Sequence, residues 1–263
     1  DFELRPRHDV EKLLGRMREI LLSISEPTLR SLMECFLIDD ALMRKMCRTG
    51  AGVKAHHAYP GGLVEHVTNI MECALRIRDL YPDVDFNLVL AGVFLHDIGK
   101  VREMDFDNAF SYTDEGQLLG HMSIGVEMLT EKIGEYQRLT RELFPKETEL
   151  RLKHMILSHH GKLEFGSPRL PAFPEALLLH YIDDMDSKME CMRALIANDR
   201  SVEGVFTQYN QALERSALNK KRYLEGVQAP VSAPVTTSTA ALKPTGNKPS
   251  SPFGAALSNA LKK

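Results

Sequence analysis

Apolar residues recur with the period of an α-helix along most of the first 200 residues. Between Val10 and Ser25 they fall at every third or fourth position: Leu13, Leu14, Met17, Ile20, Leu21 and Ile24. This spacing places them on one face of an amphipathic helix. No segment alternates long enough to form a strand that would set the architecture, so the sequence predicts an all-α fold.

The same pattern predicts further helices and a division into domains. The helices are expected at Pro27 to Leu37, Leu63 to Ile77, Phe86 to Ile98, Leu118 to Tyr136, Thr148 to His160, Pro174 to Ala197 and Val202 to Leu224. The polar segment from Val101 to Gln117 predicts a loop with a short hairpin. We expect an N-terminal helical segment (1–52) packed on a central domain (53–200), followed by a C-terminal helix (201–226).

The two ends of the chain differ from its centre. From Gln228 to Ser251 the chain consists largely of Ala, Pro, Thr and Ser. Such a segment buries too little apolar surface to offset its ordering entropy. Residues 227–263 are therefore expected to be a disordered tail. Because the chain begins with Asp1 rather than Met, we also expect that an upstream part is missing.

The composition gives no sign of a general affinity for polyanions. The 33 Lys and Arg residues stand against 36 Asp and Glu residues, a net charge of −3, so any contact with nucleic acid must be local. The cysteines show no CxxC pair, which favours reduced thiols in a cytoplasmic protein. No apolar stretch approaches the roughly 20 residues that span a bilayer, so no membrane association is expected.

Histidine and aspartate residues recur near the predicted helices at intervals that fit a metal site. The set comprises His66, His96, Asp97, His121, His159, His160 and Asp183, with Asp184 as a rival for the last position. Imidazole and carboxylate groups hold divalent transition metals, and one carboxylate can bridge two ions. Two ions held in this way could turn a water into a nucleophile for a phosphate ester.

A histidine on a helix also has an ordinary role, because buried polar groups usually find hydrogen-bond partners in the core. This explanation suits three histidines that lie in no recognisable motif: His8, His154 and His180. It suits His66, His96 and His121 less well, since each lies on or beside the apolar stripe of its helix. Imidazoles that point from separate helices into one core each need a partner, and a shared metal ion provides one.

The order H…HD…H…HH…D, with HDIGK at its second element, resembles the HD-domain metal-dependent phosphohydrolase superfamily. Four longer blocks are similar to the YhaM-type 3′ to 5′ exoribonucleases: HHAYPGGLVEH, GQLLGHMSIG, HMILSHHGKLEFGSP and PEALLLHYIDDMDSKM. The resemblance implies an HD-domain helical bundle that releases nucleoside monophosphates from the 3′ end of single-stranded RNA. In that family an oligonucleotide-binding barrel precedes the HD domain, and this chain begins about where that barrel would end.

The resemblance also implies ligands for two divalent transition-metal ions. One ion would bind His66, His96, Asp97 and Asp183, and the other would bind Asp97, His121, His159 and His160, with Asp97 as the bridge. Asp183 is preferred over Asp184 because it begins a D-x-x-D spacing that matches the acidic pair of other dinuclear HD sites. Mixed imidazole and carboxylate ligation favours Mn²⁺, with Fe, Co or Ni as alternatives, over Mg²⁺.

Further residues are candidates for contacts with substrate. Lys100, the last residue of HDIGK, is expected either to hold a phosphate oxygen or to cap a helix C-terminus. Lys54, His57 and Tyr59 precede the first predicted ligand, and Tyr59 could stack on a base. Lys162 lies on the other side and could contact a phosphate. Each of these residues could instead be simply packed or solvated.

Single-stranded RNA is thus the expected partner, with single-stranded DNA and a homo-oligomer left open. Two other classes of function remain. The first is an HD phosphohydrolase that acts on small nucleotides or cyclic dinucleotides. The second is a non-catalytic regulator that binds single-stranded nucleic acid, which the complete set of ligand-type residues disfavours.

Overall fold

The computed structural model describes residues 9–52, 59–105, 111–200 and 204–228. The chain divides into two units, Asp1–Tyr223 and Leu224–Lys263, and the elements that build the site all lie in the first. The predicted all-α fold is confirmed, because the only strands among the described residues are two of two residues each. In the same part of the chain, no helix is both long enough and apolar enough to cross a membrane.

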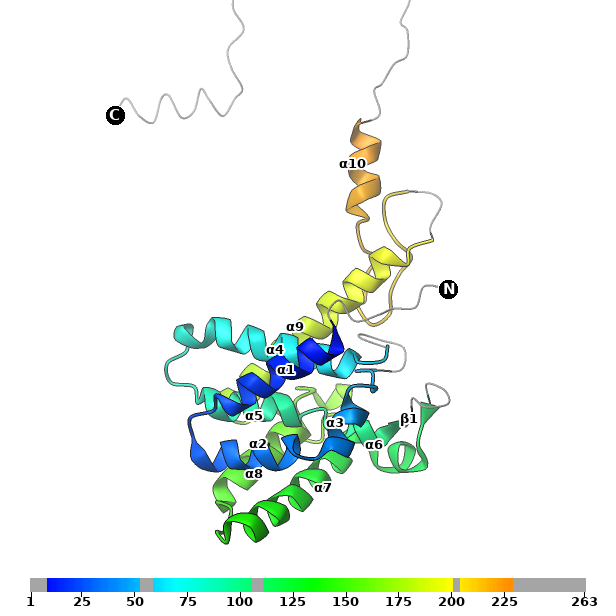
Figure 1. Cartoon of the computed structure of the whole chain (residues 1–263). Coiled ribbons are helices and arrows are strands. Elements are labelled where there is room, and N and C mark those ends of the chain that lie inside the picture. Colours follow the sequence, from blue (N-terminus) through cyan, green and yellow to red (C-terminus); the bar gives the residue numbers. More distant parts are fainter. Residues whose placement is uncertain (1–8, 53–58, 106–110, 201–203, 229–263) are drawn as a thin grey trace, which may run out of the picture. The chain divides into compact units, whose positions relative to one another are not determined.

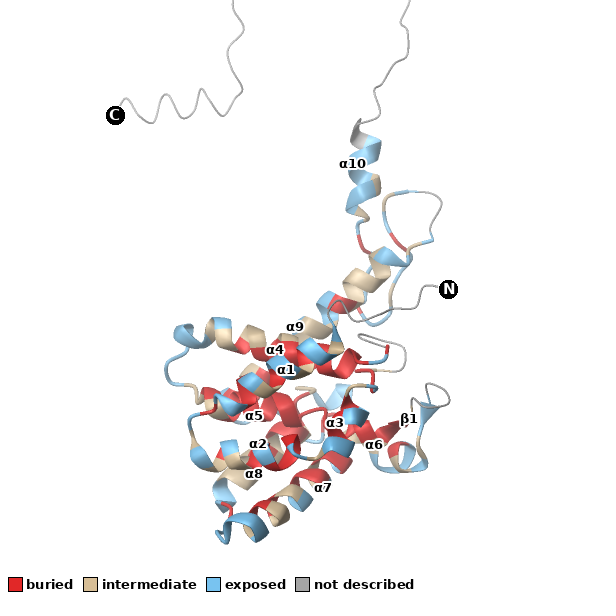
Figure 2. Cartoon of the chain, viewed as in Figure 1, coloured by how far each residue is buried: buried red, intermediate tan, exposed pale blue. Residues whose placement is uncertain are grey.

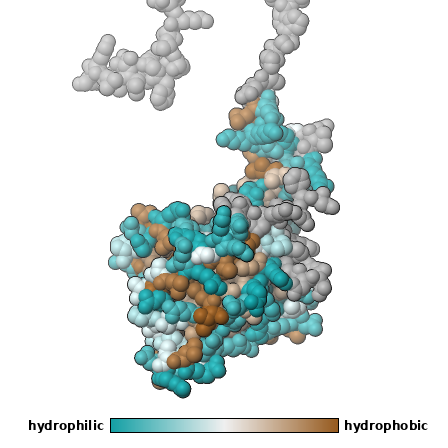
Figure 3. All heavy atoms as spheres, in the orientation of Figure 1, coloured by the Kyte–Doolittle hydropathy of each residue, from teal (hydrophilic) through white to brown (hydrophobic). Residues whose placement is uncertain are grey.

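One helix, α5, forms the centre of the bundle (Figure 1). It spans Phe86–Leu95, and its sequence FNLVLAGVFL is apolar almost all round, as expected of a helix enclosed on every side. It packs against α1 (Val10–Leu22), α2 (Pro27–Leu37), α4 (Gly62–Ile77), α8 (Lys146–Ser158) and α9 (Pro174–Ala197). Figure 2 shows the buried residues concentrated along α4 and α5. Figure 3 shows hydrophilic residues over much of the visible surface.

Polar residues fix where several of these helices begin. Asp9, Asp85 and Thr113 each accept a hydrogen bond from a backbone N–H in the first turn of the following helix, which satisfies donors that have no partner within the helix. Pro27 and Pro174 occupy the first turn of α2 and α9, where proline costs no hydrogen bond. The predicted starts at these two prolines are confirmed.

The segment after α5 holds the remaining elements around the site. It contains α6 (Lys100–Glu103), β1 (Met104–Asp105), β2 (Ser111–Tyr112) and α7 (Asp114–Thr140). The two strands pair antiparallel, with Met104 opposite Tyr112, so the predicted short hairpin is confirmed. The two ends of the segment predicted as a loop, Val101 to Gln117, are instead helical, within α6 and in the first turn of α7. The chain continues through α8, the short 3₁₀ helix η2 (Leu163–Phe165) and α9. Another 3₁₀ helix, η1 (Arg78–Leu80), follows α4.

One short helix was not predicted, and one predicted helix is wrong. The short helix α3 (Asp40–Met46) was not predicted, because its seven residues are too few to show a clear period. The helix predicted at Val202 to Leu224 is wrong: residues 204–219 are irregular, and only α10 (Lys220–Gln228) is helical. Polar side chains bond to nearby backbone there, since Thr207 Oγ1 accepts from Ala217 N and Asn210 Oδ1 accepts from Leu213 N. The predicted tail lies outside the described residues from 229 onward.

Candidate metal centre

The centre is built at the end of the central helix. His96 follows the last residue of α5, and Asp97 comes next, with exposed fractions of 0% and 2%. The apolar helix carries both side chains into the interior, where polar groups need partners. His66 reaches the same region from α4 and is also fully buried.

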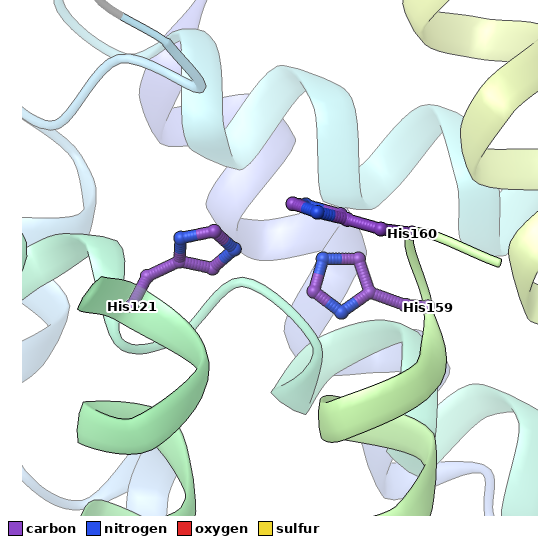
Figure 4. A group of neighbouring side chains, drawn as sticks. All are labelled: His121, His159 and His160. Carbon is purple, nitrogen blue, oxygen red and sulfur yellow. The ribbon is translucent and has the colours of Figure 1, made fainter. Parts of the chain in front are cut away.

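Six of the predicted ligands form two groups of three. In each group the donor atoms all lie within 4.8 Å of one another. The first triad is His66, His96 and Asp183, and the second triad is His121, His159 and His160. Figure 4 shows the second triad: His121 comes from α7, His159 and His160 follow α8, and the three rings gather around one space.

The seventh predicted ligand, Asp97, lies between the two triads. Its Oδ2 is 3.3 Å from His96 Nε2 and 3.8 Å from His66 Nε2, on the side of the first triad. Its Oδ1 is 3.5 Å from His121 Nε2 and 3.7 Å from His159 Nε2, on the side of the second triad. One carboxylate therefore presents one oxygen to each group.

All five histidines are oriented in the same way. Each places Nδ1 near an oxygen: His66 at 2.8 Å from Asp186 Oδ2, His96 at 2.7 Å from Val93 O, His121 at 3.2 Å from Glu103 Oε1, His159 at 2.7 Å from Ile156 O and His160 at 2.9 Å from Phe165 O. Carbonyl and carboxylate oxygens accept hydrogen bonds, so each Nδ1 carries the hydrogen and donates a hydrogen bond to its partner. This leaves Nε2 as the coordinating nitrogen of every ring, as is usual for metal-bound histidine.

The donor atoms fit a divalent cation. Within the part of the chain that the structure describes, Nε2 of His96, Nε2 of His121 and Oδ1 of Asp97 are buried without a hydrogen-bond partner. An unsatisfied buried polar atom costs about 1–3 kcal/mol. A cation between these atoms would remove that cost, and imidazole with carboxylate is a donor set for divalent transition metals.

The protonation states also suit coordination. Burial raises the pKa of Asp97, but the charges of Lys100 and His96 outweigh it and hold the pKa well below its usual value. Burial, together with the charge of His96, lowers the pKa of His159, and burial also lowers the pKa of His160. Ligands must be deprotonated to bind a metal, so an ionised Asp97 and the neutral imidazoles of His159 and His160 are ready to do so.

His66 has a different electrostatic environment. Burial lowers its pKa, but the carboxylates of Asp183 and Asp186 outweigh burial and raise the pKa to about 9. The same contact with His66 outweighs the effect of burial on Asp183 and lowers that carboxyl's pKa. A metal ion at the first triad would therefore compete with a proton on His66.

Two glycines bring His121 to the centre. Gly120 has a φ of 71°, which interrupts α7 and frees the N–H of His121 to donate to Glu103 Oε1 at 2.9 Å. Gly99 lies so close to this turn that a Cβ on it would stand 2.0 Å from the carbonyl oxygen of His121. The glycine of HDIGK thus allows the backbone that carries His121 to approach the backbone that follows Asp97.

Lys100 lies inside the centre rather than at its mouth. It is 8% exposed, and its Nζ donates to Asp97 Oδ2 and to Ala51 O, both at 2.6 Å. The alternative role as a helix C-terminal cap is wrong, because the ammonium bonds to the Asp97 side chain and to Ala51 O, which is not part of a helix. The ammonium group pairs with the oxygen of Asp97 that faces the first triad.

Of the other residues predicted to contact substrate, one is buried, one lies near the centre, and two are outside the described residues. Tyr59 is 1% exposed, and its hydroxyl donates to Glu65 Oε2 at 2.9 Å, so the stacking role is wrong because no ring face is accessible. The Nζ of Lys162 lies 5.2 Å from the ring centroid of Phe165, close to the chain that carries His160. Lys54, His57 and His8 lie outside the described residues.

The geometry separates the two rival aspartates. Asp183 Oδ1 is 3.2 Å from His66 Nε2, whereas Asp184 Oδ2 accepts from Lys188 Nζ at 2.7 Å. Asp183 is therefore the residue that joins the first triad. Asp186, the second aspartate of the D-x-x-D spacing, contacts the other nitrogen of His66.

Two residues near the centre, Glu103 and Phe165, were not expected from the sequence, and a third, His180, was expected only as a core histidine. Glu103 is buried, and its Oε1 contacts both the backbone N–H and the ring Nδ1 of His121. His180 Nδ1 donates to the carbonyl of His159 at 2.8 Å, in keeping with a hydrogen-bonded core histidine. Phe165 is 52% exposed and lines the same cavity as the ligands. The sequence alone shows only that a glutamate follows His96 by seven residues, which does not reveal its contact with His121.

The centre opens into a cavity of about 530 Å³. Its walls include the ligands Asp97, His159, His160 and Asp183, together with Lys100, Phe165 and Ser187. Such a volume is in the range of pockets that hold small organic ligands. The cavity therefore brings a nucleotide-sized space, an exposed aromatic ring and the two triads together.

Comparison with known proteins agrees with this architecture. The family model described as "HD domain" matches residues 63–188. The 3′-5′ exoribonuclease YhaM of Bacillus subtilis is 45% identical over 174 residues, which cover 66% of this chain and 52% of the relative. The proteins of the same name from Bacillus velezensis and Bacillus licheniformis are 45% and 43% identical, and 52% of each is covered.

The chain thus spans about half the length of the curated relatives that it matches. No solved structure matches it significantly. The family match begins at the first residues of α4 and ends within α9, so it takes in both triads and the aspartate between them. Residues 63–188 of this chain are an HD domain, in a chain that resembles the YhaM exoribonucleases over about two thirds of its length.

Proposed function

We propose that this chain hydrolyses phosphodiester bonds of single-stranded RNA from the 3′ end and releases nucleoside monophosphates. The observation that carries the proposal is the position of Asp97, with one oxygen facing each histidine-containing triad. The name of the relatives, 3′-5′ exoribonuclease, supports the choice of substrate. Single-stranded DNA is a weaker candidate.

Two divalent ions would be held by the two triads with Asp97 as a shared ligand. When bound, such ions lower the pKa of a coordinated water and offset negative charge on the phosphate. The mixed ligands favour Mn²⁺, with Fe, Co and Ni as alternatives. The protein's own contribution is to hold five imidazoles by their Nδ1 atoms, so that little reorganisation is needed when substrate binds.

The proposed cellular location is the cytoplasm. All four cysteines, Cys35, Cys47, Cys73 and Cys191, are free thiols, which is the usual state in a reducing compartment.

The proposal is tested with a 5′-labelled, ten-nucleotide single-stranded RNA and Mn²⁺-loaded protein. We expect a ladder of products that shorten by one nucleotide at a time, because a single 3′-terminal nucleotide fits the cavity. Hydrolysis of cyclic dinucleotides or free mononucleotides with the RNA left intact would favour the alternative phosphohydrolase. RNA binding without hydrolysis of any of these substrates would favour the non-catalytic regulator.

Asp183 and Asp184 provide a matched pair of variants. Asp183→Ala should lose the metal ion of the first triad, because its carboxylate is the only acid of that triad apart from the shared Asp97. Asp184→Ala should retain both ions, since its carboxylate pairs with Lys188. Metal analysis of the two purified proteins distinguishes them, and equal metal content would contradict the assignment.

Lys100→Ala should affect both stability and turnover. Without metal, the change leaves the buried carboxylate of Asp97 without its cation, which costs about 3–5 kcal/mol of unfolding free energy. Added Mn²⁺ should restore part of this loss, because it supplies positive charge at the same carboxylate. Turnover should fall about 10²-fold if the ammonium also stabilises the phosphate in the transition state.

Melting curves with and without Mn²⁺, together with steady-state rates, check both effects. Lys146→Ala is a suitable control, because this side chain is 73% exposed and pairs with Glu149 on its own helix. If turnover of Lys100→Ala fell by less than about threefold, or roughly 0.6 kcal/mol of barrier, the role as a phosphate clamp would be abandoned.

Phe165 is proposed to stack on the base of the 3′-terminal nucleotide. Its ring is half exposed in the cavity, with the ammonium of Lys162 nearby. Stacking contributes about 1–3 kcal/mol per base, so Phe165→Ala should raise KM about 5- to 150-fold. The carbonyl that orients His160 belongs to the backbone and is retained, so metal content should not change. Phe165→Tyr should keep KM near its original value, and an unaltered KM in the alanine variant would refute stacking.

A further inference from the structure

A second, larger pocket lies beside the metal centre and plays no part in the chemistry described above. Its volume is about 720 Å³, and it lies between α3 with the segment that follows it and α6 with the hairpin. Figure 1 shows α3 and α6 next to each other. Four basic residues line it: Arg44, Lys45, Arg48 and Arg102.

The basic side chains differ in how their charges are compensated. Arg102 forms ion pairs with Glu115, Glu127 and Glu131, so its charge is already offset. Arg44 and Lys45 are exposed, and neither makes an ion pair with any other residue that the structure describes. Two acidic residues, Asp105 and Glu115, also line the pocket, and Glu115 is the one that pairs with Arg102. Arg44 and Lys45 are therefore the two basic side chains of the pocket whose charges remain available, in a protein whose net charge is −3.

Hydrogen bonds connect one wall of the pocket to the elements of the metal centre. Thr49, which lines the pocket, donates through Oγ1 to Lys45 O at 2.8 Å, and its own carbonyl accepts from Leu63 N at the start of α4 at 3.1 Å. Two residues later, the carbonyl of Ala51 accepts from Lys100 Nζ. The segment that follows α3 is thus anchored both to the helix that carries His66 and to the lysine that contacts Asp97.

We propose that Arg44 and Lys45 bind backbone phosphates of the RNA strand, 5′ of the nucleotide whose bond is broken at the metal centre. This inference rests on the proposed function, because it assigns the path of the same substrate. A mononucleotide would already be held within the 530 Å³ cavity, so only an oligonucleotide would extend to a second pocket. Phosphates need no base-specific contacts, and exposed Lys and Arg side chains suit them.

The test compares the double variant Arg44→Gln/Lys45→Gln with the control Arg76→Gln/Arg78→Gln. The control residues are also exposed, but they lie at the C-terminal end of α4, whereas His66 lies in its second turn. Binding of a labelled ten-nucleotide RNA is followed by fluorescence anisotropy between 50 and 300 mM salt. Each protein also carries Asp97→Asn, so that the RNA is not consumed.

Each lost phosphate contact lowers the slope of log affinity against log salt by about 0.7 for a single strand. The double variant should therefore lose about 1.4 in slope and bind at least about tenfold more weakly at low salt, while the control keeps the original values. With Asp97 restored, kcat/KM for the ten-nucleotide RNA should fall at least fivefold more than kcat/KM for a dinucleotide.

An equal slope for the double variant and the control would overturn the inference, even if the protein hydrolyses RNA normally. An equal loss of kcat/KM for the long and short substrates would also overturn it, because a dinucleotide is too short to reach the second pocket and should not be affected. Failure of the proposed function would look different: the unsubstituted chain would release no product from either RNA.

Discussion

Replacement of Asp97 by Ala should abolish hydrolysis and remove bound metal. The carboxylate faces both triads, with oxygens 3.3 Å from His96 Nε2 and 3.5 Å from His121 Nε2. Its loss removes a ligand from both proposed ions at once, so we expect activity to fall by at least about 10³-fold. Metal analysis and the rate of RNA shortening, measured on the same preparation, check the two effects together.

Two further variants keep this test interpretable. Asp97→Asn retains the size of the side chain while removing its charge, which separates loss of ligation from collapse of the site. Asp79→Ala serves as the control, because Asp79 has a side chain that is 95% exposed. Normal turnover in Asp97→Ala would rule out the proposed role of the metal pair. Loss of turnover with full metal content would show that Asp97 acts in another way.

Substitution of Gly99 by Ala should destabilise the protein and displace His121. A Cβ at this position would lie 2.0 Å from His121 O and 2.8 Å from Gly125 N. Both are backbone atoms, so α7 itself must move. Overpacking of this kind costs about 1–3 kcal/mol or more, which corresponds to a fall in Tm of about 2–12 °C for a domain of this size.

Gly134→Ala is the matched control on the same helix. Nothing lies within 4 Å of a Cβ built at Gly134, so the change should stabilise α7 by up to about 1 kcal/mol. Thermal unfolding of both variants, with metal content of Gly99→Ala, measures the effect. A Tm for Gly99→Ala equal to that of the unsubstituted protein would show that α7 adjusts freely, and the explanation of the HDIGK glycine would fail.

Much of the fold could be predicted because its helices are strongly periodic. The start of α9 at Pro174 and its end at Ala197 follow from the proline and from the apolar stripe. The segment before α10 could not be predicted in this way. There, the side chains of Thr207 and Asn210 accept hydrogen bonds from backbone N–H groups and stabilise an irregular chain. Such bonds compete with a helix without changing the apolar pattern.

In the site, the proposed metal ligands could be predicted from the sequence, but the residues that orient them could not. Three of the seven ligand-type residues, His66, His96 and His121, were indicated by their positions on or beside an apolar stripe, where a polar group is costly without a partner. The full set followed from the order of the histidines and aspartates, which resembles that of HD domains. The groups that orient them were less visible. Glu103 reaches His121 only because Gly99 and Gly120 bring two segments together, and the burial of Tyr59 depends on a contact with Glu65 inside the bundle.

Anomalous diffraction from crystals grown with Mn²⁺ is the most direct test of the central claim, that two ions share Asp97. We predict two anomalous peaks in each chain, one in contact with Nε2 of His66 and His96 and the other in contact with Nε2 of His121, His159 and His160. Asp97 should lie between the peaks and contact both. A single peak, or peaks that leave either triad without an ion, would contradict the two-ion account.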